Sequence, residues 1–155
     1  MSFEIRRVIT GHDEKGKARV MIDEISDNVI SRRAGQKSTV IWATDQTPAN
    51  LSEFNDFSAE VIETTIPNGS VFRVSRFDPG VAPRNHRTAS LDYAVVISGT
   101  IDMELDDGEV VNLKAGDVLV QRGTVHNWTN PGTEPCIVAF ILLSAPLPKN
   151  LAAEG

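Results

Sequence analysis

Two histidines, His86 and His126, are the residues of this sequence best suited to chemistry. Histidine changes charge near neutral pH and is the commonest metal ligand, so both residues are candidates for proton transfer or metal binding. Polar and small residues recur around them at defined spacings. In the first region these residues are Gly80, His86, Thr88, Asp92 and Gly99; in the second they are Gly116, Asp117, Gln121, Arg122, Gly123, His126 and Asn130.

Short apolar segments separated by turn residues must position these histidines. From Ser70 onward they recur roughly every eight to twelve positions, which is typical of a β-sandwich or barrel. In Thr100–Leu105 apolar and acidic residues alternate, so one face of that strand meets the core and the other meets water. Ile137–Leu143 is apolar on both faces, as in a strand enclosed between two layers. We therefore predict a compact antiparallel β-barrel, with strands Val71–Phe77, Tyr93–Ser98, Thr100–Leu105, Glu109–Leu113, Asp117–Gln121 and Cys136–Leu143 and a hairpin turn at Asp106-Asp107-Gly108.

The first 69 residues have a weaker apolar pattern and are interpreted as an arm of short strands, at Ile5–Ile9, Val20–Ile22 and Thr39–Trp42. An arm that cannot form its own core must pack on the barrel or on a second subunit, so we expect a homodimer. The predicted organisation is an arm over 1–69, a barrel over 70–146 and a tail over 147–155. His12 lies in the turn-like Gly11-His12-Asp13 and is left out of the candidate site.

The two histidine regions resemble the paired motifs of the cupin superfamily, G-x5-H-x-H-x(3 or 4)-E-x6-G and G-x5-P-x-G-x2-H-x3-N. The resemblance covers roughly Ser70 to Pro146. In particular, the sequence is similar to small single-domain cupins through the segments His86-Arg87-Thr88, Asp92-Tyr93 and Gln121-Arg122-Gly123-Thr124. This resemblance implies an all-β, antiparallel double-stranded β-helix, or jelly-roll barrel, and it also implies a homodimer.

The sequence departs from the motifs at ligand positions. Thr88 replaces the second histidine, Asp92 replaces the glutamate, and Gln121 replaces the proline. The resemblance leaves His86, Asp92 and His126, a set that can hold iron, or less diagnostically zinc, with open positions for water and substrate. One alternative is a divalent metal (iron, zinc, manganese or nickel) on these three residues; the other is no tightly held metal. Without a metal, either histidine would move a proton and Asp92 would orient it.

The resemblance implies a pocket in the barrel mouth for a small organic molecule, either a carboxylate or an aromatic or ketonic acid. An enzyme there would be of the decarboxylase, isomerase or dioxygenase type. The alternative is a non-catalytic ligand-binding or sensing cupin with a decayed metal site. Arg73 and Arg76 project to opposite faces of one strand, and either could clamp a carboxylate, but for each we predict the commoner place on the outer face. Trp42 and Trp128 are predicted to have packing roles.

Charge and composition exclude several partners. The formal net charge is −6, so no overall positive field would attract nucleic acid or anionic lipid. The only cysteine, Cys136, cannot form an internal disulfide and lies in an apolar run, where we predict an inert core residue. No apolar run approaches the roughly 20 residues that span a bilayer, and the first residues do not resemble a secretion signal. We expect a cytoplasmic protein.

Overall fold

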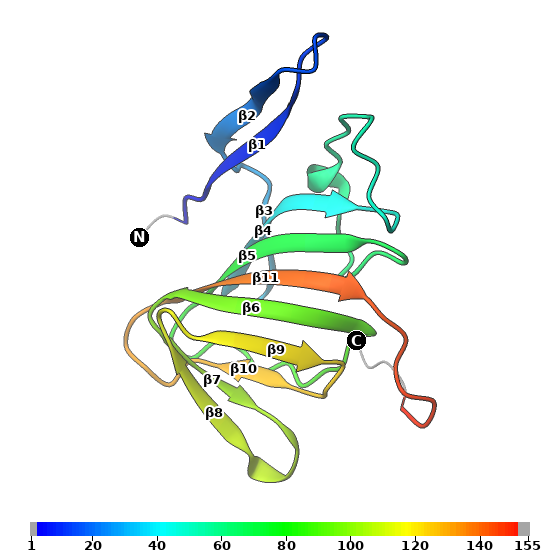
Figure 1. Cartoon of the computed structure of the whole chain (residues 1–155). Coiled ribbons are helices and arrows are strands. Elements are labelled where there is room, and N and C mark those ends of the chain that lie inside the picture. Colours follow the sequence, from blue (N-terminus) through cyan, green and yellow to red (C-terminus); the bar gives the residue numbers. More distant parts are fainter. Residues whose placement is uncertain (1–2, 152–155) are drawn as a thin grey trace.

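A computed structural model describes residues 3–151, and their regular structure is almost entirely β (Figure 1). Two short 3-10 turns interrupt the strands, η1 (Ser58–Glu60) and η2 (Asp106–Gly108). Among residues 3–151, no helix has the length and apolar character needed to cross a bilayer. The strands are β1 (Arg6–His12), β2 (Ala18–Ile25), β3 (Val29–Arg33), β4 (Gln36–Thr44), β5 (Ser70–Phe77), β6 (Ser90–Ser98), β7 (Thr100–Glu104), β8 (Val110–Lys114), β9 (Val118–Arg122), β10 (Asn127–Thr129) and β11 (Cys136–Ser144).

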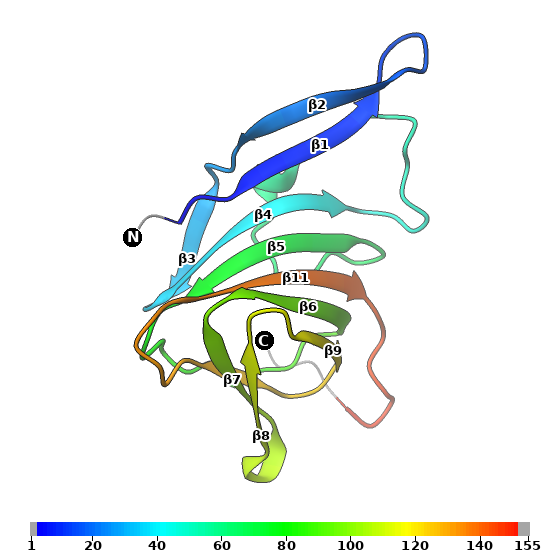
Figure 2. The same cartoon turned by 60° about the vertical axis from the view of Figure 1, so that its left-hand side comes forward.

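Two antiparallel sheets form the body of the protein. The larger has six strands in the order β3-β4-β5-β11-β6-β9, and the smaller has three in the order β10-β7-β8. The smaller sheet lies across one face of the larger (Figures 1 and 2), and fully buried side chains such as Val71, Ile101 and Val138 come from both. From β8 to β11 the chain alternates between the smaller and the larger sheet, which is typical of jelly-roll connectivity. The predicted all-β jelly-roll barrel is confirmed.

The predicted alternation is confirmed in β7, where Ile101 and Met103 are buried. In β6, Asp92, Ala94 and Val96 are buried, whereas Tyr93 on the other face is 41% exposed. The β7–β8 turn also has the predicted chemistry, since Gly108 has φ 77°. Burial of Cys136 raises the pKa of its thiol to about 11, as fits the inert core residue predicted from sequence.

One prediction about β11 is wrong for the single chain. Its inner face is buried, but Ile141 on the other face is 36% exposed because that face lies on the outside of the six-stranded sheet. Exposed apolar residues of neighbouring strands surround it, including Phe72 on β5 and Tyr93 on β6. The apolar run predicts that both faces of β11 are buried, but a single chain buries only the inner face.

The N-terminal 69 residues contribute to the body and also project from it. β4 pairs with β5 and so extends the six-stranded sheet, whereas β1 and β2 form a separate hairpin (Figure 2). Arg7 ties this hairpin to the body: its guanidinium donates to the Ile41 carbonyl at 3.1 Å and forms an ion pair with Asp56 at 2.7 Å. The domain boundary at residue 70 stays a prediction.

Candidate functional site

A pocket between the two sheets brings the predicted site residues together. About 540 Å³ lies between its walls, part of it open to solvent. His86, Asp92 and His126 all line it, as does Thr88. The remaining lining combines polar, apolar and basic side chains: Gln36, Thr64, Ser75, Phe77, Trp128, Phe140, Leu142, Arg32, Arg33, Arg73 and Arg84.

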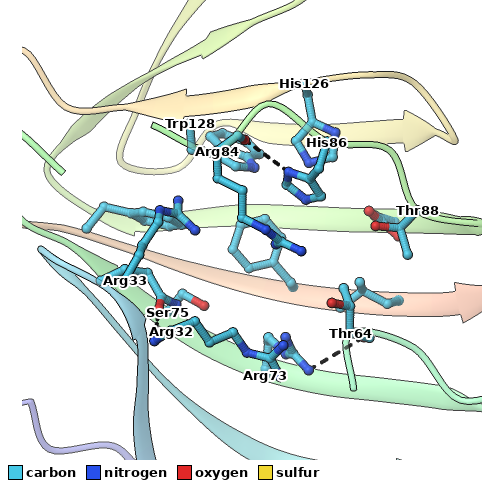
Figure 3. A pocket seen from close by; sticks show the side chains of 15 residues that line it. Arg32, Arg33, Thr64, Arg73, Ser75, Arg84, His86, Thr88, His126 and Trp128 are labelled. Atoms are coloured by element: carbon cyan, nitrogen blue, oxygen red, sulfur yellow. Dashed lines mark hydrogen bonds between the residues drawn. The ribbon is translucent and has the colours of Figure 1, made fainter. Parts of the chain in front are cut away.

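Backbone pairing holds the two histidines side by side. The amide of His86 donates to the carbonyl of His126 at 3.0 Å, and the reverse bond measures 2.9 Å. The ring centroids are 4.3 Å apart (Figure 3). Nδ1 of His86 donates to the Arg84 carbonyl at 3.0 Å, and Nδ1 of His126 donates to the Thr124 carbonyl at 2.9 Å. Because a carbonyl only accepts, each neutral ring carries its proton on Nδ1 and keeps a lone pair on Nε2.

Burial keeps both imidazoles neutral. It lowers the pKa of His86 to about 4, and the positive charges of Arg84 and Arg33 act in the same direction. Burial also lowers the pKa of His126, again helped by Arg84 and Arg33. At neutral pH the pair can therefore accept a proton or bind a metal.

Asp92 lines the same pocket from β6. Burial raises the pKa of its carboxyl to about 6, against the opposing effects of the Ser90 hydroxyl and the Arg73 guanidinium. The Ser90 hydroxyl donates to Asp92 Oδ1 at 2.5 Å. Asp92 is therefore a buried carboxyl that changes charge close to neutral pH.

The donor set does not fit the three-ligand metal centre. Within residues 3–151, no group of three His, Cys, Asp or Glu side chains is placed to hold one metal ion. The structure brings His86 and His126 together, while Asp92 lines the pocket and bonds to Ser90. Thr88 occupies the position of the second motif histidine. Two neighbouring imidazoles are a small ligand set for a tightly held ion.

Arg73 is the main correction to the predicted site. It was expected on the outer face, but it is only 7% exposed and lines the pocket. Its terminal nitrogen donates to the Glu63 carbonyl at 3.0 Å, and its buried Nε has no hydrogen-bond partner. Burial, together with the positive charges of Arg32 and Arg84, lowers its pKa to about 10. Arg76, on the other face of β5, pairs with Asp78 at 2.7 Å.

Sequence reasoning missed the arginine lining for identifiable reasons. Arg73 shares its strand face with Val71, Ser75 and Phe77, so the alternation of β5 contained the signal. Arg32 and Arg33 end β3, a strand that was not predicted, and Arg84 lies in the loop before His86. No spacing links these residues to the histidine motifs.

An aromatic wall closes the inner side of the pocket. Trp128 lies with its ring centroid 5.5 Å from Phe140 and 6.2 Å from Phe77. All three are buried and belong to the main core, so the packing role predicted for Trp128 is confirmed. The pocket therefore combines apolar and cationic surfaces.

Comparisons with known proteins agree with this geometry. Residues 73–142 match the cupin domain family. The cupin-domain-containing oxidoreductase fogC of Aspergillus ruber is 41% identical over 148 residues, which cover 88% of this chain and 71% of that protein. The chain belongs to the cupin-domain family. The cupin-domain-containing oxidoreductase virC of Hypocrea virens is 34% identical over 147 residues, covering 88% of this cupin and 74% of that protein.

Solved structures show the same fold. An uncharacterized conserved protein with a double-stranded β-helix domain from Klebsiella pneumoniae superposes with a TM-score of 0.53 at 24% identity, covering 83% of this cupin and 91% of that chain. An RmlC-like cupin from Shewanella frigidimarina gives a TM-score of 0.51 at 15% identity. The superposition covers 82% of this cupin and 89% of that chain.

Proposed function

We propose that this cupin binds a small organic acid in its pocket and acts on it as an enzyme of the oxidoreductase type. The observation that carries the proposal is the pocket lining: four arginines and, among the described lining residues, one acidic side chain, Asp92. Guanidinium groups suit carboxylates because their planar donors can form paired hydrogen bonds. The names of fogC and virC support the oxidoreductase class. Decarboxylation, isomerisation and dioxygenation stay open as finer proposals.

The site residues divide into two roles in this proposal. Arg73 holds the carboxylate, since its buried Nε is a donor without a partner. His86 or His126 takes a proton at Nε2 from a C–H or O–H group of the bound carboxylate, and the electron pair of that bond stays on the substrate, because both imidazoles are neutral with Nδ1 bonded to backbone. Asp92 supplies or accepts a proton near neutral pH.

A comparison of an acid with its neutral analogue tests the binding step. We expect benzoate to bind at least tenfold more tightly than benzamide in isothermal titration calorimetry, since only the acid pairs with a guanidinium. Arg73→Gln should remove most of that preference, whereas the matched Arg76→Gln, on the outer face of β5, should keep it. Equal affinity for acid and amide in the parent protein would reject the proposal.

Metal analysis tests the alternative set of His86, Asp92 and His126. We expect well under one equivalent of iron, zinc, manganese or nickel in protein purified without chelator, because the described residues provide two adjacent imidazoles and no third ligand beside them. One equivalent in the parent protein and none in His86→Ala would instead show that Asp92 or another group completes the centre.

Thr88 at the lost ligand position also favours a second candidate function, a non-catalytic sensing cupin.

The two functions differ in the fate of the bound acid. The test supplies dioxygen, ferrous ion and nicotinamide or flavin cofactors in turn. An acid that binds through Arg73 and is still recovered unchanged would favour the sensing cupin.

The homodimer, the cytoplasmic location and the absence of nucleic-acid binding stay proposals. The net charge of −6 and the exposed apolar face of the six-stranded sheet support them in part.

A further inference from the structure

The four pocket arginines come from different parts of the chain. The charges of Arg33 and Arg84 act on both imidazoles, and Arg84 also interacts with Arg73 and Arg32. Arg32 and Arg73 lie by the loop before β5: Arg32 donates to the carbonyl of Ile62 and Arg73 to the carbonyl of Glu63. Figure 3 shows Arg84 next to the histidines, with Arg73 and Arg32 on the opposite side of the pocket.

These positive charges repel one another, and Arg73 is buried among them, whereas Arg33 and Arg84 are half-buried and Arg32 is exposed. Arg32 and Arg84 both act against the charge of Arg73, and Arg84 acts against that of Arg33. Asp92 is the one acidic side chain lining the pocket between residues 3 and 151, and its attraction is directed at Arg73. Keeping the buried Arg73 charge beside other positive charges is costly, so such a group is expected where a ligand brings the opposite charge.

Arg33 and Arg73 are each held by neutral groups from different parts of the chain. Arg33 Nε donates to the Ala82 carbonyl at 2.8 Å, and its guanidinium lies 5.9 Å from the centre of the Phe77 ring. Arg73 is positioned by the Glu63 carbonyl, and its Nε stays unpaired. The supports orient both side chains along the pocket wall.

We propose that the occupant of the pocket is an organic diacid. One carboxylate lies at Arg73 and Arg32, and the other lies at Arg33, over the Phe77 ring. The inference rests on the proposed function and adds to it the second acidic group and the direction of binding. The aromatic wall of Phe77, Trp128 and Phe140 fits an apolar or aromatic body between the two acids. A single compact anion at Arg73 would leave Arg33, which is held by the Ala82 carbonyl, without a carboxylate.

Rigid and open-chain diacids test the proposal against their mono-acids. The probes are benzoate with phthalate, isophthalate and terephthalate, then butyrate with succinate, and finally inorganic phosphate as a compact dianion. In calorimetric titrations at constant ionic strength, we expect at least one diacid to bind tenfold or more tightly than its mono-acid. Arg33→Gln and Arg73→Gln should each reduce that diacid to the affinity of the mono-acid. Arg76→Gln, outside the pocket, should leave the affinity unchanged, and circular dichroism confirms the fold of each variant.

The outcomes separate this inference from the proposed function. If benzoate binds through Arg73 and no diacid exceeds its mono-acid, the diacid inference fails while the proposed function stands. If phosphate matches the best diacid and keeps its affinity in Arg33→Gln, the site takes one compact anion and the inference fails. If neither acids nor diacids bind, both proposals fall. A diacid advantage that disappears in Arg33→Gln supports the inference.

Discussion

Replacing His126 with alanine is expected to lower turnover of the bound acid at least 100-fold, with a change in affinity of no more than about threefold. The imidazole would act on a proton, whereas the arginines hold the acid, so the loss falls on kcat rather than on binding. Product formation followed by liquid chromatography and mass spectrometry gives kcat, and calorimetry gives the affinity. His12→Ala, on the exposed β1–β2 hairpin, is the matched control and should leave both unchanged.

The pH dependence of the same reaction gives a second readout. An ordinary histidine base loses activity as pH falls through about 6.5. Because burial lowers the pKa of His86 to about 4, the neutral base persists to lower pH, and turnover should be retained well below pH 6. The pKa of Asp92 is about 6, so its titration would overlap with that of a histidine. The pH profile of turnover is therefore measured in Asp92→Asn, where only the histidines titrate in the pocket. Loss of activity centred near pH 6.5 in that variant, or full activity of His126→Ala, would contradict proton transfer by the pair.

Replacing Arg73 with methionine is expected to abolish acid binding and to raise the free energy of unfolding by about 1 kcal/mol. The native side chain buries a charge among other arginines and leaves Nε unpaired, which costs stability that an apolar side chain of similar length would recover. Urea unfolding measures the stability, and calorimetry with benzoate measures the binding.

Arg76→Met separates this effect from a general effect of removing charge. Arg76 pairs with Asp78 and its side chain is only 14% exposed, so its loss should lower stability rather than raise it and should leave acid binding intact. A marked loss of stability in Arg73→Met would show that its bonds to the loop carbonyls outweigh the burial cost. Retained acid binding in Arg73→Met would remove the anchor that the account assigns to this residue.

Most of the fold was predictable because its strands carry regular local patterns. The alternation of β7 and β6 places Ile101 inside and Tyr93 outside, and the turn residues between β7 and β8 are those that positive φ requires. β10 has only three residues, too few for a period, and β3 is short and polar at its end. The outer face of β11 misled the prediction because apolar residues there remain on the surface of a single chain.

The candidate site was predictable only where its residues follow a spacing. His86 and His126 belong to motifs, and backbone pairing brings them together. The arginines come from β3, β5 and a loop, so only the folded chain places them around one pocket. Arg73 shows the limit most clearly. It alternates with the buried face of β5, which indicates an inward position, but arginine side chains usually lie on the surface, and the prediction followed that preference.

A crystal structure of the protein with the tightest-binding acid of the probe set would show where the carboxylate lies. We expect the acid inside the pocket, with a carboxylate oxygen about 2.7–2.9 Å from Arg73 Nε and the remainder of the molecule extending toward the His86–His126 pair. An acid bound at another surface, or in the pocket with its carboxylate turned away from Arg73, would contradict this expectation.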